Sequence, residues 1–278
     1  MIIERFLNPK NLTRMKNDFK FLIKMIQGKD YMGEFDLAFR DNYFNLYYKG
    51  NSLAKVVFSK GNSYKISINT KFFSNTGAAK DKRFSAVKKG DYFEIVLDNK
   101  LLHPFFQKKY INQFISNIRE VNNGEEITLE QAIITDNLER ENIIIIDRQI
   151  MDKIFKKRMD LLALRQVKEN KNEYSFCIIE VKLGNNPQLK DEVANQLNDY
   201  VFHIEKYFDD YKKCYEQHYE QKKGLGLLIT PKYETIEIVK PVNGMIAVVG
   251  YSGIAKNQIA QLKSKYLILD VKSFVYLL

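Results

Sequence analysis

The sequence contains no tryptophan, two cysteines and no apolar run near the ~20 residues that a membrane-spanning helix needs. Cys177 and Cys214 do not have the paired spacing of metal ligands, and two cysteines are too few for a disulfide-stapled secreted chain. Charges interrupt the apolar residues at the N-terminus, so we expect no signal peptide. A phosphate-binding loop of the type GxxxxGK[ST] is also missing, which argues against ATP hydrolysis. These absences predict a protein of the reducing cytoplasm with no membrane partner.

Positive charge is concentrated in one part of the chain. The 278 residues are 45% hydrophobic and 13% aromatic, enough for two modest domains or one large one. Residues 1–124 hold 22 Lys/Arg and 11 Asp/Glu, a net charge of +11, whereas residues 125–278 sum to −1. A basic module favours a polyanion partner, DNA above all, because neutralised phosphates release counterions. The alternative is a lysine-rich surface that serves solubility alone.

Residues 1–124 have the pattern of a smaller α+β domain that binds or positions nucleic acid. Apolar and basic residues alternate at helical spacing over 10–27, and Pro104 is expected to open a helix over Phe105–Val121. Residues 77–89 are polar and basic, which predicts an exposed loop. Asn122-Asn123-Gly124 marks the expected boundary. Period-two runs predict strands at Phe35–Arg40, Tyr43–Lys49, Leu53–Phe58, Tyr64–Thr70 and Tyr92–Leu97.

Residues 125–278 have the pattern of an α/β domain with a mixed sheet flanked by helices. A helix is expected from the N-cap Thr128 to about Arg140, and a long one from Asn186-Pro187 to Gly224. The expected strands are Ile143–Ile146, Arg158–Gln166, Tyr174–Leu183, Leu225–Thr230, Met245–Tyr251 and Tyr266–Val271.

The pattern Glu-x-Lys occurs three times, and only one copy lies in a strand-like context. Glu169-Lys171 and Glu220-Lys222 lie in charged stretches and are expected to be solvated surface. In contrast, Glu180 and Lys182 interrupt an apolar run and share one face of a strand, because side chains alternate along it. Charges at the end of a buried strand are costly unless they are paired or coordinated.

Asp160 supplies a second carboxylate in the same kind of context, since it interrupts the apolar strand of residues 158–166. The separation of 20 positions between Asp160 and Glu180 suffices for two hairpin-paired strands, which would bring both carboxylates to the same end. Two carboxylates without histidine or cysteine form a hard-oxygen site suited to Mg²⁺ or Mn²⁺. A lysine beside them can orient a water or balance charge on a phosphorane, as phosphodiester hydrolysis requires. A simple ion pair of Lys182 is the alternative interpretation.

Asp160 followed by Glu180-Val181-Lys182 resembles the signature of the PD-(D/E)XK nuclease superfamily, which has the restriction-endonuclease-like fold. Residues 196–200 add a second resemblance, because Gln196 and Tyr200 match the Gln-x-x-x-Tyr element of the RecB-like branch. The resemblance covers about residues 128–230. Arg158-Met159 precede the aspartate where the family often has Pro or Gly, which leaves the subfamily open.

The resemblance implies a role for each of these residues. Asp160 and Glu180 would be metal ligands with the carbonyl of Val181 as a third, and Lys182 would be the catalytic lysine. Gln196 would hold the lysine, the water or a phosphate oxygen, and Tyr200 would lie near the substrate backbone.

The family often adds a carboxylate from the first helix. Glu130 is our choice and Glu139 the second, although either also fits a solvated helix charge.

The densest basic cluster outside this region lies in residues 80–89, with Phe84 interleaved. It favours a DNA-contacting loop, and the alternative is a solvated one. The three histidines do not have metal-ligand spacing, and His203, seven residues after Gln196, is expected to be a surface or half-buried side chain. The members of the cluster are Lys80, Lys82, Arg83, Lys88 and Lys89.

The sequence therefore predicts a divalent-metal-dependent deoxyribonuclease that acts in DNA repair, restriction or phage defence. The alternative is a catalytically inactive nuclease fold that serves as a nucleic-acid-binding protein or scaffold. DNA or RNA, single or double strands, endo or exo action, the recognition sequence and a homodimer all stay open, because one fold hosts many functions.

Overall fold

The computed structural model describes residues 1–28, 31, 33–121, 124–169, 171–189, 192–229, 231–249, 253, 256–258, 260, 261 and 270–274. The chain divides into two compact units. The N-terminal unit is Glu4–Ile127 with Gln221–Leu228, and the C-terminal unit is Met1–Ile3, Thr128–Glu220 and Ile229–Leu278.

The division differs from the expected one in two short segments. Ile2 belongs to the C-terminal unit, where its N–H donates to Asp210 Oδ2 (2.8 Å). Residues 221–228 belong to the N-terminal unit, where the Gln221 amide bonds both backbone groups of Leu7 (2.9 and 2.7 Å). Contacts across more than 200 residues leave no local pattern in a sequence. The predicted boundary residues Asn122 and Asn123 lie outside the described residues.

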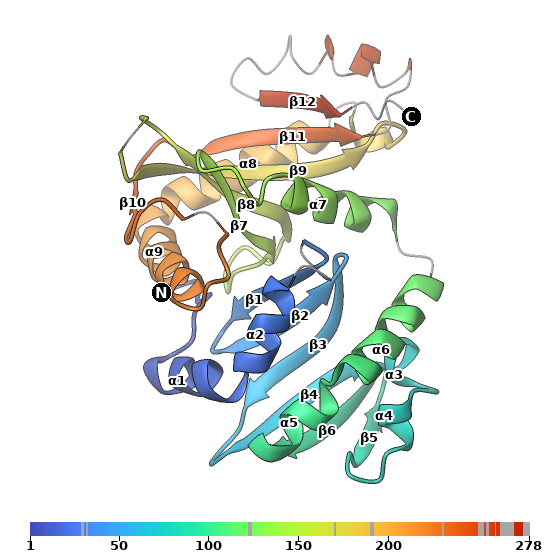
Figure 1. Cartoon of the computed structure of the whole chain (residues 1–278). Helices are drawn as coiled ribbons and strands as arrows, with labels where there is room; N and C mark the ends of the chain where they lie inside the picture. Colours follow the sequence, from blue (N-terminus) through green and yellow to red (C-terminus); the bar gives the residue numbers. More distant parts are fainter. Residues whose placement is uncertain are drawn as a thin grey trace. The chain divides into compact units, whose positions relative to one another are not determined.

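The N-terminal unit is a six-stranded antiparallel sheet in the order β1-β2-β3-β4-β6-β5 (Figure 1). Alternate residues such as Tyr64, Ile66 and Ile68 of β4 are buried, as the period-two pattern predicts. Its strands are β1 Phe35–Arg40, β2 Tyr43–Tyr48, β3 Asn51–Phe58, β4 Ser63–Asn69, β5 Ala86–Lys89 and β6 Tyr92–Asp98. Its helices are α1 Pro9–Asp18, α2 Lys20–Gln27, α3 Thr70–Phe73, α4 Gly77–Lys80, α5 Asn99–Phe105 and α6 Lys108–Glu120.

The C-terminal unit has a mixed sheet in the order β12-β11-β9-β8-β7, with β10 also paired to β9. The first three strands along the chain are antiparallel neighbours, whereas β11 runs parallel to β9 and β12 parallel to β11. The elements are α7 Glu125–Asp136, β7 Ile143–Ile150, β8 Met159–Gln166, β9 Glu173–Leu183, η1 Pro187–Leu189, α8 Glu192–Lys206, α9 Phe208–Gly224, β10 Glu237–Ile238, β11 Asn243–Val249 and β12 Asp270–Phe274.

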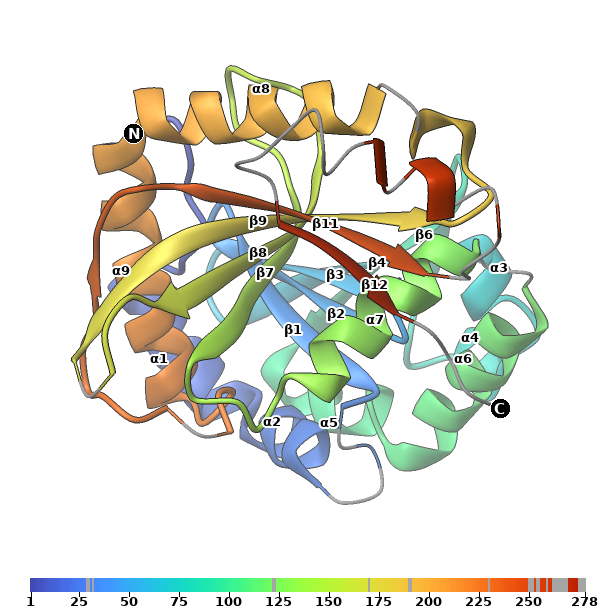
Figure 2. The ribbon, with the colours of Figure 1, turned by 90° about the horizontal axis from the view of Figure 1, so that it is seen from above.

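Helices cover both faces of this sheet, with α7 on one face and α8 on the other (Figure 2). Ile133 and Ile134 of α7 pack on a face that includes Leu161 and Ile179. On the α8 side, Gly244 of β11 lets the helix approach closely, because a Cβ there would lie 2.9 Å from Leu197 Cγ. The C-terminal unit is therefore an α/β layer structure in which β8 and β9 are central.

Several predicted elements were wrong in position or type, among them the long helix expected from Asn186-Pro187 to Gly224, which is divided into η1, α8 and α9. Pro104 lies inside α5, which begins earlier because Asp98 caps it by accepting from Lys100 N–H (2.9 Å). The helix expected from Thr128 begins at Glu125. Residues 77–89 form α4 and β5 in place of a loop.

The strand expected at Leu225–Thr230 is also wrong over the described residues 225–229, which terminate α9. Gly226 has φ +68° and Leu227 N–H donates to the Lys222 carbonyl (2.9 Å), as at many helix C-termini. Residues 266–269 of the last expected strand lie outside the described residues, and β12 begins at Asp270. No helix in the described part of the chain combines the length and apolar character needed to cross a membrane.

Candidate active site

The pairing of β8 with β9 brings Asp160 and Glu180 together. The antiparallel pairing of β8 with β9 ends at Leu161 and Ile179, and Asp160 and Glu180 are the next residue of each strand at that end. Residues at matching positions of two neighbouring strands project from the same face of the sheet. Asp160 is half-buried, whereas Glu180 is almost fully buried. One carboxylate is thus enclosed and the other reaches the surface.

Glu180 is held by a lysine and a glutamine. Lys182 Nζ lies 2.9 Å from Glu180 Oε1, and the Gln196 amide donates to the same oxygen (3.0 Å). The side chains of Glu180 and Lys182 are only 1% and 9% exposed. Two ions this deeply buried require one another, because an isolated buried charge is strongly destabilising. The strand-borne Glu-x-Lys copy is therefore a buried ion pair supported from α8.

Tyr200 extends this network towards the chain segment before β8. Gln196 Nε2 donates to the Tyr200 hydroxyl (2.6 Å), which donates to the Arg158 carbonyl (2.9 Å). Burial raises the pKa of Tyr200 to about 12, and the negative charges of Glu180 and Asp160 act in the same direction. Tyr200 is therefore a neutral hydrogen-bond donor at physiological pH.

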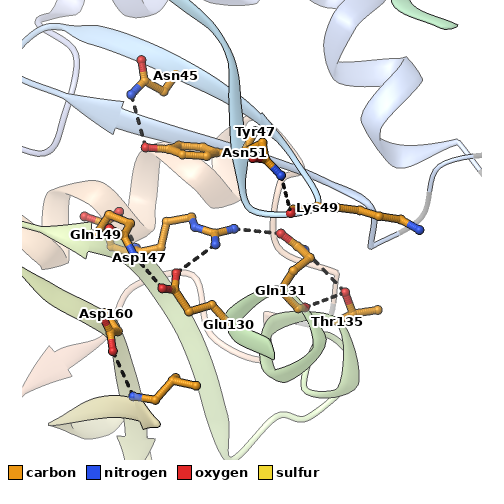
Figure 3. A network of polar contacts seen from close by, with 12 residues as sticks. Asn45, Tyr47, Lys49, Asn51, Glu130, Gln131, Thr135, Asp147, Gln149 and Asp160 are labelled. Atoms are coloured by element: carbon orange, nitrogen blue, oxygen red, sulfur yellow. Dashed lines mark hydrogen bonds and ion pairs between the residues drawn. The ribbon is translucent and has the colours of Figure 1, made fainter. Parts of the chain in front are cut away.

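Asp160 is oriented by the strand beside it. The backbone N–H of Val181 donates to Asp160 Oδ2 (2.9 Å), and Figure 3 draws this bond as the dashed line at Asp160. Because Val181 lies between Glu180 and Lys182, the same three-residue stretch of β9 supplies the second carboxylate, the lysine and the group that orients Asp160.

Glu130 lies near Asp160 but is bonded to other residues. Arg148 Nη2 donates to Glu130 Oε2 (3.0 Å) and Gln149 Nε2 to Oε1 (2.6 Å), as Figure 3 shows. Burial raises the pKa of Glu130, and the negative charge of Asp160 adds to this effect against the opposing charge of Arg148. Glu130 is thus part of a buried pair beside the site. The second choice, Glu139, is exposed beyond the end of α7.

The donor chemistry fits a hard divalent cation. Asp160 and Glu180 offer carboxylate oxygens, which are the donors that Mg²⁺ and Mn²⁺ prefer. Among the described residues, no group of three or more His, Cys, Asp or Glu side chains is placed to hold a metal ion. Mg²⁺ uses one or two carboxylates and completes its octahedron with water and phosphate oxygens, so two carboxylates suffice.

The basic cluster of residues 80–89 lies on the surface, as expected, but its residues belong partly to α4 and β5 and not to a loop. Its five basic side chains are exposed, and Arg83 Nη2 pairs with Asp81 Oδ2 (2.7 Å). Lys89 forms an ion pair with Glu94. Phe84 is 2% exposed and packs edge-to-face on Phe105, so it is core and does not offer a ring to a base.

Sequence reasoning missed a buried cluster next to the site. Asp152, between β7 and β8, contacts His203 and accepts from the Tyr211 hydroxyl (2.7 Å). His203 is buried, and its position seven residues after Gln196 on α8 was the available signal.

The prediction that Lys222 is solvated surface was wrong, since Lys222 is 4% exposed and pairs with Asp36 (3.6 Å) in the N-terminal unit.

Comparison with known proteins gives no significant match to a family model, a curated protein or a solved structure.

Proposed function

We propose that the protein is a divalent-metal-dependent nuclease that hydrolyses phosphodiester bonds of DNA. The supporting observation is the convergence of Asp160, Glu180, Lys182 and Gln196 at one end of β8 and β9. The order of elements supports the restriction-endonuclease-like fold of the PD-(D/E)XK superfamily. A helix is followed by three antiparallel strands, two further helices and strands parallel to the third. The RecB-like branch is proposed from Gln196 and Tyr200.

In this proposal the two carboxylates, with the carbonyl of Val181, hold Mg²⁺ or Mn²⁺. The bound ion would supply Lewis-acid stabilisation of charge on the phosphate. Lys182 orients the attacking water and balances charge, and its ion pair with Glu180 fixes its ammonium group at the site. Gln196 holds Glu180, and Tyr200 fixes the backbone of Arg158 beside the substrate path.

The N-terminal unit would bind or position the nucleic acid. The chain up to residue 124 carries a net charge of +11, and phosphate neutralisation supplies most non-specific affinity. Both cysteines are buried and neither is in a disulfide, which fits the reducing cytoplasm. Repair, restriction and phage defence are settings that need such an enzyme, and a homodimer would allow cuts in both strands.

The direct test is cleavage of plasmid, linear duplex and single-stranded DNA in Mg²⁺ or Mn²⁺. Asp160→Ala and Lys182→Ala are expected to lower the rate by ~100-fold or more, because each removes charge stabilisation at the phosphate. Lys171→Ala is the matched control, since it alters the exposed Glu-x-Lys copy and should cut as the wild type does. Intact DNA under all conditions, or full activity of the two site variants, would refute the proposal.

A second candidate is an inactive nuclease fold that binds nucleic acid or serves as a scaffold. The contacts of Glu180 with Lys182 and Gln196 are compatible with it as well, because a purely structural buried ion pair has the same contacts. Calorimetry with Mn²⁺ separates the two candidates. Heat of binding that Asp160→Ala abolishes supports the nuclease, and its absence in the wild type supports the inactive protein.

A further inference from the structure

The segment between β7 and β8, residues 151–158, is strongly basic, although residues 125–278 as a whole have a small net negative charge. We call it the β7–β8 loop. It holds four basic residues and one acid, a net charge of +3, whereas residues 125–278 sum to −1. All four basic side chains are exposed: Lys153, Lys156, Lys157 and Arg158.

Two apolar side chains of the same loop also face solvent. Met151 is 53% exposed and Ile154 is 51% exposed. Lys156 has φ +49° and is the central residue of a three-residue turn closed by the Lys157 N–H and the Phe155 carbonyl (2.5 Å). A non-glycine residue in this region is strained, and such strain clusters at functional sites. The loop thus holds apolar and cationic groups outward in a conformation that the chain does not favour on its own.

Buried contacts fix the loop to the helices behind it. Asp152 Oδ1 accepts from the N–H groups of Ile154 and Phe155 (2.8 and 2.7 Å), and Oδ2 contacts His203 and accepts from Tyr211. The Phe155 ring stacks on His203, with centroids 4.5 Å apart. A ligand binds more tightly when the element that contacts it already has its bound conformation. The contacts around Asp152 hold the β7–β8 loop in one conformation before any ligand binds.

The loop ends at the candidate site. The Arg158 carbonyl accepts from Tyr200, and Asp160 follows two residues later. Lys157 pairs with Asp199 on the exposed surface of α8 (3.0 Å), a contact of small energetic value. Among the described residues, neither Lys156 nor Arg158 is in an ion pair with a carboxylate.

We propose that the β7–β8 loop binds the strand to be cut, with its basic side chains on phosphates and Ile154 and Met151 against bases. The inference rests on the proposed nuclease function. Cationic groups beside the catalytic carboxylates offset repulsion between those carboxylates and the phosphates. Apolar side chains among basic ones can insert between base steps. An anionic membrane surface also attracts basic, apolar loops, but the position beside Asp160 favours a nucleic acid.

Photocrosslinking tests the contact of Ile154. Cys177 and Cys214 are buried, so Ile154→Cys can be labelled selectively with a benzophenone maleimide. Val167→Cys is the control, because Val167 is 43% exposed and follows the opposite end of β8. In EDTA with a labelled DNA duplex or single strand, we expect at least ~5-fold more crosslinking from position 154. Equal crosslinking from both positions, or crosslinking to anionic lipid vesicles in place of DNA, would overturn the proposal.

Binding in EDTA tests the charges independently of cleavage. We expect Lys156→Gln/Arg158→Gln to weaken DNA binding about tenfold and to lower the slope of log K against log salt by ~1.8, at ~0.9 per phosphate contact. The control Lys168→Gln/Lys171→Gln removes the same charge from the exposed turn at the other end of β8. If the loop variant binds DNA more weakly than the control but the wild type never cleaves DNA, only the proposed nuclease function is refuted. If the wild type cleaves DNA and the loop variant binds DNA as well as the control does, only the proposed role of the β7–β8 loop is refuted. If the wild type does not bind DNA, both proposals are refuted.

Discussion

Gln196 joins three parts of the C-terminal unit through one amide group. It donates to Glu180 on β9 and to Tyr200 on its own helix, and Tyr200 in turn donates to the segment that precedes Asp160. A side chain that orients a metal-binding carboxylate typically changes metal affinity or activity 10–100-fold when it is removed. Gln196 is therefore the residue where a small change is most informative.

We expect Gln196→Ala to lower the cleavage rate by ~10–100-fold and to raise the Mg²⁺ concentration needed for half-maximal rate, because Glu180 loses the amide that orients it. Asn198→Ala, on the same helix, is the control. A rate and a Mg²⁺ dependence equal to those of the control would show that the amide contact has no role in catalysis.

The candidate site residues that the sequence indicates share one property: each is marked by a pattern of neighbouring residues in the sequence. Glu180 and Asp160 each interrupt an apolar strand, and Gln196 and Tyr200 are spaced for one helical face. Glu130 had no comparable signal. Its partner Arg148 is 18 residues away and fully buried, in a stretch that resembles the polar end of a strand. A long-range pair of this kind cannot be recognised from either residue alone.

At the scale of the element, Asp152 determines the conformation of the β7–β8 loop. Burial opposes its ionisation, but hydrogen bonds from Phe155, Tyr211, His203 and Ile154 outweigh burial and hold the pKa of Asp152 below its usual value. The ionised form is therefore favoured by folding. This stabilisation is present above the unfolded pKa of ~3.9 and is lost as the pH falls through the lower folded value.

We expect Asp152→Asn to lower the free energy of unfolding by about 2 kcal/mol at pH 7, since an amide replaces an ionised acceptor of buried hydrogen bonds. The difference from the wild type should shrink as the pH falls below ~4. Urea unfolding at a series of pH values measures it. Glu169→Gln makes the same chemical change in an exposed turn and should cost little. A penalty for Asp152→Asn that is independent of pH would contradict this assignment.

Elements were predictable where the pattern was periodic and local. Five of the six strands of the N-terminal unit agree with their expected positions within a few residues, and β5 was expected to be loop. β7 was expected to end at Ile146 but continues to Ile150 through an irregularity between Ile145 and Asp147. The irregular register breaks the alternation that would have revealed the rest of the strand.

At the scale of the whole molecule, the distribution of charge separates two roles. Residues 1–124 carry +11 and the remainder −1, although the remainder has the candidate site and the +3 of the β7–β8 loop. Binding of a polyanion should then depend on charges of the N-terminal unit for affinity and on the loop for placement at the carboxylates. Each role predicts a different response to the removal of lysines.

We expect Lys80→Gln/Lys82→Gln/Lys88→Gln to weaken DNA binding ~10-fold or more and to lower the salt slope by up to ~2.7, because three exposed charges within nine residues lose their phosphate contacts. Titrations in EDTA at several salt concentrations measure both quantities. Lys10→Gln/Lys16→Gln/Lys20→Gln removes equal charge from exposed positions on α1 and at the first residue of α2. A smaller loss in this control supports a defined contact at residues 80–88. Equal losses of DNA affinity in the two variants would mean that only the total charge of the unit matters, without a defined contact. No loss of affinity in either variant would mean that the basic surface serves solubility.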